Sequence, residues 1–167
     1  TGIITQELLR RLPSTATLLT FEINPRFTHY LKSVVSDPRM VLVTASAETL
    51  RHEVRRMGFD RIDAAVSSLG LAVMPDHLRH SILGSLSGLL ADQGVFTQYH
   101  YLPGVQFQNG RLAKSTVVNL LQRYFRSVHR GIEWRNLPPA FVLTCRDPLA
   151  QQGPLVRLPH GNRPFSL

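Results

Sequence analysis

The chain has 167 residues, of which 43% are hydrophobic and 18% charged, a balance typical of one globular domain with its own core. No stretch approaches the run of about 18 apolar residues that a membrane-spanning helix needs. The 19 Lys and Arg residues outnumber the 11 Asp and Glu residues, so phosphate-bearing partners such as anionic lipid or nucleic acid are candidates. The single cysteine, Cys145, lies in an apolar run, which excludes a disulfide framework and predicts a buried thiol.

The first part of the chain predicts alternating helices and strands. Helices are expected over 3–11, 25–35 and 48–57, and strands over 17–22, 41–44 and 62–67. Pro13 ends the first helix, Asn24 and Pro25 begin the second, and Gly58 ends the third. The apolar content of 62–67 predicts a strand that is buried on both faces.

The second part predicts a long helix from Pro75 to about Asp92, a strand over 95–101, a loop over 102–113 and a helix over 115–129. Two further strands, over 131–135 and 140–146, are separated by a turn too short for a crossover helix. They are therefore expected to be antiparallel. We expect one domain over 1–146, followed by a proline-rich, disordered tail over 147–167.

This order predicts an α/β domain with a mostly parallel sheet that ends in an antiparallel hairpin. The chain opens on Thr1 and Gly2 without an initiator Met or a signal pattern. Because these two residues look like the end of a glycine-rich loop before a helix, we expect a first strand and the rest of that loop to lie upstream.

Three strand ends carry candidate site residues. Glu22 follows the first strand, twenty positions after Gly2, where nucleotide-binding α/β folds place a carboxylate for ribose hydroxyls. The alternative is a carboxylate that caps the next helix. Ser46 follows the second strand and either binds a ligand or caps the helix after it. Ser67 and Ser68 follow the third, where small residues suit either a reacting group or a plain loop.

Three stretches of the sequence stand out together: Ser67-Ser68-Leu69, the segment Phe96-Thr97-Gln98-Tyr99 with Tyr101, and Trp134-Arg135-Asn136-Leu137-Pro138-Pro139-Ala140-Phe141-Val142. They resemble bacterial phospholipid N-methyltransferases, which are class I S-adenosylmethionine-dependent methyltransferases. With Thr1-Gly2 and Glu22 they extend the resemblance over residues 1–146. The resemblance implies a Rossmann-like methyltransferase fold and stepwise methylation of phosphatidylethanolamine toward phosphatidylcholine.

The resemblance also implies S-adenosyl-L-methionine as the cofactor and a role for each candidate residue. The cofactor is expected to be bound by Thr1, Gly2, Glu22, Ile23, Ser46, Ala47, Ser67 and Ser68. Tyr99 and Tyr101 are the candidate catalytic residues, which would orient the acceptor amine. Methyl transfer needs no metal, and His77 and His80 lack the neighbours of a metal site, so we expect both to be exposed to solvent.

Residues 111–135 hold six cations against one acidic residue, Glu133. Arg123, Arg126 and Arg130 would share one face of the predicted helix, which is either simply solvated or faces anionic lipid. We therefore expect a protein on the cytoplasmic side, peripheral at the inner face of the membrane, that acts on a phospholipid, with nucleic acid the less favoured partner. Two alternatives stay open: a methyltransferase acting on RNA or another soluble substrate, and a non-catalytic fragment of the fold.

Overall fold

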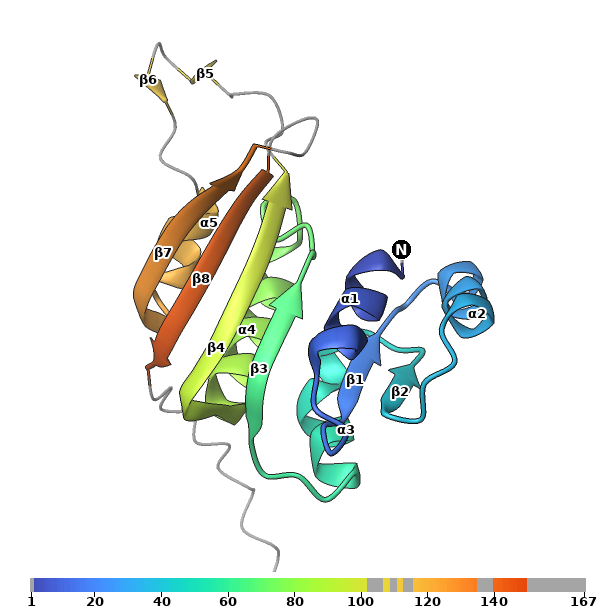
Figure 1. Cartoon of the computed structure of the whole chain (residues 1–167). Coiled ribbons are helices and arrows are strands. Elements are labelled where there is room, and N and C mark those ends of the chain that lie inside the picture. The colour runs from blue at the N-terminus through green and yellow to red at the C-terminus, as the bar shows by residue number, and fades with distance from the viewer. Residues whose placement is uncertain (1, 102–106, 109–110, 113–115, 135–139, 150–167) are drawn as a thin grey trace, which may run out of the picture.

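The computed structural model describes residues 2–101, 107–108, 111–112, 116–134 and 140–149, which form an α/β fold (Figure 1). The helices are α1 (Ile3–Arg11), α2 (Pro25–Val34), the 3-10 helix η1 (Ala47–Thr49), α3 (Leu50–Arg56), α4 (Asp76–Leu89) and α5 (Thr116–Leu121). The strands are β1 (Leu18–Phe21), β2 (Met40–Val43), β3 (Ile62–Ser67), β4 (Leu90–Tyr101), β5 (Phe107–Gln108), β6 (Arg111–Leu112), β7 (Phe125–Glu133) and β8 (Ala140–Pro148).

The helix boundaries of the first half follow from local signals. Helix α1 has the predicted bounds. Asn24 caps α2, because its side-chain oxygen accepts a hydrogen bond from the backbone N–H of Arg26 at 2.9 Å, and Pro25 is the first helical residue. Gly58 has φ +81°, and it follows the end of α3, as expected for a residue that leaves a helix in the left-handed region.

The described strands form two larger sheets and a small hairpin. Strands β1 and β2 pair in parallel. The second sheet has the order β3-β4-β8-β7, in which β3 and β4 are parallel, while β8 is antiparallel to both of its neighbours. The predicted antiparallel pairing of the last two strands is therefore confirmed, and β8 is the strand that joins the hairpin to the parallel part.

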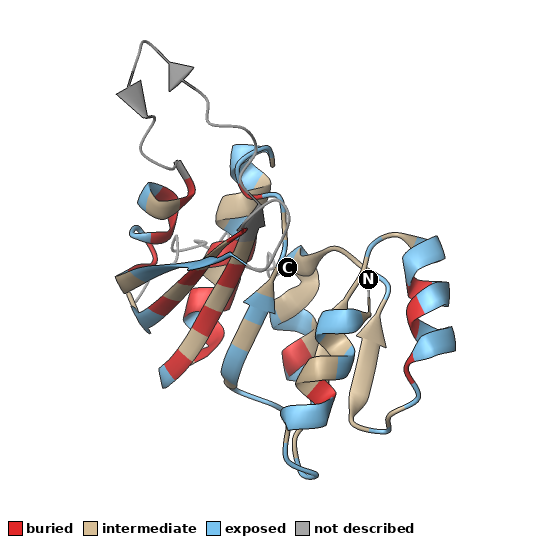
Figure 2. Ribbon diagram, turned by 45° about the horizontal axis from the view of Figure 1, so that its top comes forward, coloured by how far each residue is buried: buried red, intermediate tan, exposed pale blue. Residues whose placement is uncertain are grey.

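The main core lies between the four-stranded sheet and helices α4 and α5, which cover one of its faces (Figure 1). Phe96 and Phe125 stack at its centre, with ring centroids 5.6 Å apart. Cys145 is fully buried there, and burial raises the pKa of its thiol to about 12, so the predicted inert thiol is found. Figure 2 shows the buried residues concentrated around this sheet, whereas β1 and β2 are only half-buried.

The helix predicted over 115–129 is wrong beyond residue 121. Helix α5 ends at Leu121, and β7 begins at Phe125 and pairs with β8 along its length. The apolar residues Val117, Leu121 and Tyr124 do face the core, so the helical spacing was real over its first turns. Residues 125–133 form a strand and not a helix because β8 provides hydrogen-bond partners for their backbone groups.

Four smaller expectations also differ from the structure. Strand β3 is not buried on both faces, since Asp63, Ala64 and Val66 are exposed beside an unpaired edge. Strand β4 begins at Leu90, five residues before the predicted start, and the predicted loop 102–113 contains the short strands β5 and β6. Strand β8 reaches Pro148, past the predicted boundary at 146, while Thr1 and residues 150–167, most of the predicted tail, lie outside the described residues.

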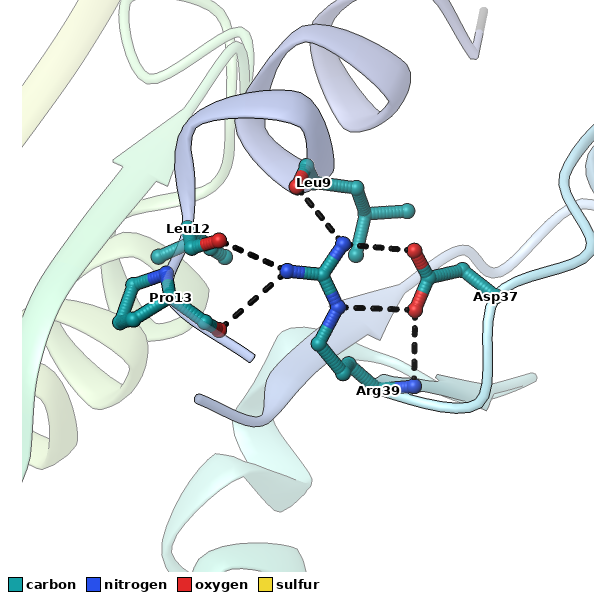
Figure 3. A network of polar contacts seen from close by, with 5 residues as sticks. All are labelled: Leu9, Leu12, Pro13, Asp37 and Arg39. Carbon is teal, nitrogen blue, oxygen red and sulfur yellow. Dashed lines mark hydrogen bonds and ion pairs between the residues drawn. The ribbon is translucent and has the colours of Figure 1, made fainter. Parts of the chain in front are cut away.

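Arg39 ties the end of α1 to the start of β2 (Figure 3). Its guanidinium forms a two-point ion pair with Asp37, at 2.7 and 3.0 Å. It also donates to the carbonyl oxygens of Leu9 and Leu12, both at 2.7 Å, and to that of Pro13 at 3.2 Å. The last carbonyls of a helix lack partners within it, so Arg39 satisfies them and fixes α1 against the small sheet.

Strands β1 and β3 point the same way but belong to different sheets (Figure 1). Among the described strands, β1 pairs only with β2, and β3 pairs only with β4. Each strand therefore turns one edge toward a groove that both of them line. This groove contains the candidate site.

Candidate functional site

The groove between β1 and β3 has a volume of about 610 Å³. All residues of β1 and β3 line it, and α1 contributes Ile4, Thr5 and Leu8. Helix α4 contributes Ile82, Leu83 and Leu86. Small-molecule sites are usually mostly apolar clefts with a few polar groups, and in open α/β sheets ligands bind outside the carboxyl ends of the strands.

Gly2 lies at the start of α1 and lines the groove. Its φ of +81° favours glycine, and an added Cβ would contact Val34 at 3.4 Å. No side chain caps this helix, although its first N–H groups lack intrahelical partners and carry partial positive charge. The position suits a ligand that brings hydrogen-bond acceptors to a helix N-terminus, while Thr1 lies outside the described residues.

Glu22 lies immediately after β1, is half-buried and lines the groove. Its Oε1 accepts a hydrogen bond from the backbone N–H of Asn24 at 2.8 Å. This contact fixes the carboxylate at the strand end, and the capping role of α2 belongs to Asn24 instead. Ile23 is 69% exposed and is not among the residues that line the groove.

Ser46 caps η1, because its hydroxyl oxygen accepts from the backbone N–H of Glu48 at 3.3 Å and its carbonyl accepts from the hydroxyl of Thr49 at 2.9 Å. The capping alternative is therefore present in the structure, and a ligand contact of Ser46 stays a prediction. Ala47 lines the groove, so the loop after β2 does reach it.

Ser67 and Ser68 lie where β3 ends, and both line the groove. The Ser67 hydroxyl oxygen accepts a hydrogen bond from the backbone N–H of Leu69 at 3.1 Å, which makes a tight turn directly after the strand. The structure thus brings Gly2, Glu22, Ala47, Ser67 and Ser68 to one groove, although they come from four separate stretches of the chain.

Tyr99 lies on β4 but is not among the residues that line the groove. Neighbouring residues of a strand point to opposite faces, and Gln98, which does line the groove, is fully buried on the core side. Tyr101 ends β4 opposite Ala140, and its side chain lies outside what the structure describes. The catalytic roles of both tyrosines stay predictions.

Gln98 is the groove residue that the sequence analysis did not single out. A polar residue two positions after Phe96 on the same strand face is the signal that could have identified it, because that face is otherwise apolar.

His80 was predicted to be exposed to solvent, but it is partly buried, and its Nδ1 lies 2.5 Å from the hydroxyl of Tyr124. Over the described residues, no group of three or more metal-ligating side chains occurs.

The cations predicted on one helix face have a different arrangement. Arg123 lies in the turn after α5, whereas Arg126 and Arg130 lie on β7, because the predicted helix stops early. All three are exposed, as is Arg146 on the neighbouring β8, and the Arg130 guanidinium stacks over the Phe141 ring at 4.9 Å from its centroid. Arg123, Arg126 and Arg130, which lie on β7 or just before it at the sheet edge farthest from the groove, are called the basic strip. No described helix is long and apolar enough to span a membrane.

No family model matches the chain. A curated relative, the ornithine lipid N-methyltransferase of Singulisphaera acidiphila, is 26% identical over 147 residues, which cover 87% of this chain and 71% of the relative. Among solved structures, a candidate rRNA methylase of Clostridium thermocellum matches with a TM-score of 0.63 and 19% identity, over 86% of this chain and 80% of the other. The N-methyltransferase NodS of Bradyrhizobium japonicum, in complex with S-adenosylhomocysteine, matches with a TM-score of 0.60 and 14% identity. This match covers 89% of this chain and 74% of NodS.

These likenesses give the chain the Rossmann-like fold of class I methyltransferases. They support an S-adenosylmethionine-dependent methyltransferase, with S-adenosylmethionine as the methyl donor. The groove fits that cofactor, since it combines an uncapped, glycine-led helix N-terminus with a carboxylate at the end of the next strand.

Proposed function

We propose that the protein methylates the amine of a phospholipid headgroup, taking phosphatidylethanolamine stepwise toward phosphatidylcholine, with S-adenosylmethionine as donor. The observation that carries this proposal is the groove in which Gly2, Glu22, Ser67 and Ser68 meet at the carboxyl ends of β1 and β3. The relative named as an ornithine lipid N-methyltransferase supports a lipid-borne amine as acceptor.

In this proposal the N-terminal side of the groove holds the cofactor. Glu22 accepts hydrogen bonds from the ribose hydroxyls, with its carboxylate already oriented by the Asn24 N–H. Gly2, at the start of α1, lies against the cofactor, and Thr1 is proposed to contact the cofactor as well. Ile23, Ser46 and Ala47 are proposed to border its nucleoside part. When bound, S-adenosylmethionine supplies an electrophilic methyl group on a sulfonium.

The other side of the groove holds the acceptor. Ser67 and Ser68 border the amine where β3 ends, and the small size of both residues leaves room for it. Holding an amine in line and excluding water supplies much of the rate enhancement for such a displacement. A primary amine with a pKa of about 10.4 must also lose a proton before it attacks. Tyr101, at the end of β4, stays the proposed residue that orients this amine, whereas Tyr99 does not line the groove.

The basic strip of Arg123, Arg126 and Arg130 is proposed to hold the protein at the inner face of the membrane. Each cation near an anionic lipid surface contributes about 1 kcal/mol. Because the strip lies at the far edge of the sheet from the groove, its role is docking of the protein and not recognition of the headgroup.

The proposal is tested by supplying labelled S-adenosylmethionine together with vesicles of phosphatidylethanolamine, vesicles that contain ornithine lipid, or bacterial RNA. Label in mono-, di- and trimethylated phosphatidylethanolamine supports the proposal. Label in RNA alone would favour the soluble-substrate alternative, and label in ornithine lipid alone would keep the lipid amine but change the headgroup.

A further inference from the structure

Gln98 is a buried polar side chain inside the proposed acceptor side of the groove. It lies on β4 directly opposite Ser67 of β3, is 0% exposed, and lines the groove with Ser67, Ser68 and Leu69. The groove is also lined by the apolar residues Phe96, Leu83 and Leu86. A fully buried amide among apolar side chains needs hydrogen-bond partners for both its nitrogen and its oxygen.

The orientation of this amide is set by two backbone carbonyls. Its Nε2 donates to the carbonyl oxygen of Leu69 at 3.0 Å and to that of Tyr99 at 2.7 Å. Carbonyl oxygens only accept hydrogen bonds, so the NH₂ group must face them and the amide cannot be reversed. Both N–H donors are thereby used, and the Leu69 contact ties β4 to the turn after β3.

The side-chain oxygen of Gln98 is not used by these hydrogen bonds. Gln98 Oε1 is buried and has no hydrogen-bond partner in the described part of the chain. A buried acceptor of this kind is uncommon in folded proteins and calls for a donor. The groove residues around it are mostly apolar, which points to a donor on the molecule that enters the groove.

The proposed acceptor carries such a donor. Primary, secondary and tertiary amines or their ammonium forms have at least one N–H in the protonated state, whereas a quaternary trimethylammonium has none. A site with a buried, otherwise unpaired acceptor therefore distinguishes headgroups that carry an N–H from the quaternary headgroup, because a ligand without the N–H leaves the oxygen unsatisfied.

We propose that Gln98 Oε1 accepts a hydrogen bond from the acceptor amine, and that Gln98 thereby selects headgroups that still carry an N–H over the fully methylated headgroup. This inference rests on the proposed function, and it adds a specificity-determining residue to the same groove. The same contact predicts weaker binding of the last methylation product, since that product can no longer donate a hydrogen bond to the buried oxygen.

The test compares the binding of short-chain phosphatidylethanolamine and short-chain phosphatidylcholine by calorimetry, with S-adenosylhomocysteine present. We expect the parent protein to favour the ethanolamine headgroup by about fivefold or more, the range of one hydrogen bond. Gln98→Met, of similar length but without an acceptor, should bring the ratio of the two affinities close to one. Gln122→Met, at an exposed glutamine, serves as the matched control.

The ratio of affinities is the readout because partial unfolding of a variant lowers both affinities equally. An unchanged ratio in Gln98→Met, or no preference in the parent protein, would overturn the role of Gln98 alone. If the parent protein binds neither lipid, the proposed phospholipid substrate fails, and the inference fails with it.

Discussion

The carboxylate of Glu22 accepts a hydrogen bond from the backbone N–H of Asn24, 2.8 Å away, two residues along the chain. Asn24 in turn caps α2, so the end of β1, the carboxylate and the helix start form one rigid unit. The carboxylate is thus oriented before any ligand arrives. Preorganised groups bind more tightly because less freedom is lost on binding.

Glu22→Ala should weaken the binding of S-adenosylmethionine by about 1.5 to 3 kcal/mol for each charged hydrogen bond lost, which is tenfold or more in dissociation constant. Glu22→Gln keeps an oxygen for the Asn24 N–H and should show a smaller loss. Calorimetry measures both. Glu7→Ala removes a carboxylate from α1 that does not line the groove and is the control; unchanged affinity in Glu22→Ala would remove Glu22 from the site.

The Arg39 contacts predict a stability effect that is independent of the site. Arg39→Lys keeps the charge but cannot reach Asp37 and three backbone carbonyls at once. We expect a clearly lower melting temperature, because the carbonyls at the end of α1 lose their partner. Arg56→Lys changes an arginine that pairs with Glu53 at the surface and should leave the melting temperature nearly unchanged. Equal melting temperatures for the two variants would show that α1 is held by other contacts.

The ion pair between Arg39 and Asp37 predicts that the stability of the fold depends on pH. The hydrogen bonds from Arg39 lower the pKa of the Asp37 carboxyl from its ordinary 3.8 to about 2. A lowered folded-state pKa means that the stabilisation is fully present above pH 4 and is lost as the pH falls toward 2. Asp37→Asn should remove this part of the acid sensitivity, seen as a shallower fall in melting temperature between pH 4 and pH 2.

The basic strip predicts binding to anionic membranes. Replacing both Arg126 and Arg130 by Gln should reduce sedimentation with anionic vesicles at low salt, and the parent protein should lose binding as salt rises. The affinity for S-adenosylmethionine should not change, because the strip is far from the groove. Arg55 and Arg56 replaced by Gln give the same change in charge where both arginines already pair with acidic residues. Equal sedimentation of both double variants would mean that the strip is only solvated.

Much of the fold could be predicted because local signals and hydrophobic pattern agree over α1, α2, β3 and α4. The failure at 115–129 has a physical cause. Residues after Leu121 fit helical spacing, yet the long-range ladder with β8 decides their structure, and a single sequence does not reveal which distant strand will pair. The division of the strands into two sheets likewise depends on contacts between distant segments.

The candidate site was predictable where a residue follows a strand. Glu22, Ser67 and Ser68 were identified from strand ends, which parallel strands bring together, and Gly2 from its place before a helix. Gln98 was missed because its significance comes from burial and from two backbone carbonyls that only the fold supplies. The placement of Tyr99 away from the groove follows from the same alternation that places Gln98 within it.

The groove also leads to a prediction about the sheet itself. The facing edges of β1 and β3 expose backbone groups and apolar residues, with Val66 46% exposed, an arrangement that invites pairing with another strand. We predict that the 167-residue chain associates or melts at low temperature. Size-exclusion chromatography and thermal unfolding test this prediction; a monomeric chain that melts cooperatively at an ordinary temperature would contradict it.

The central claim is that the groove between β1 and β3 binds the methyl donor. Amide hydrogen exchange with and without S-adenosylhomocysteine tests it most directly, because it reports every segment at once. The account predicts slower exchange at the start of α1, around Glu22 and at residues 66–71, and no change along β7. Protection confined to other segments, or no protection at saturating ligand, would contradict it.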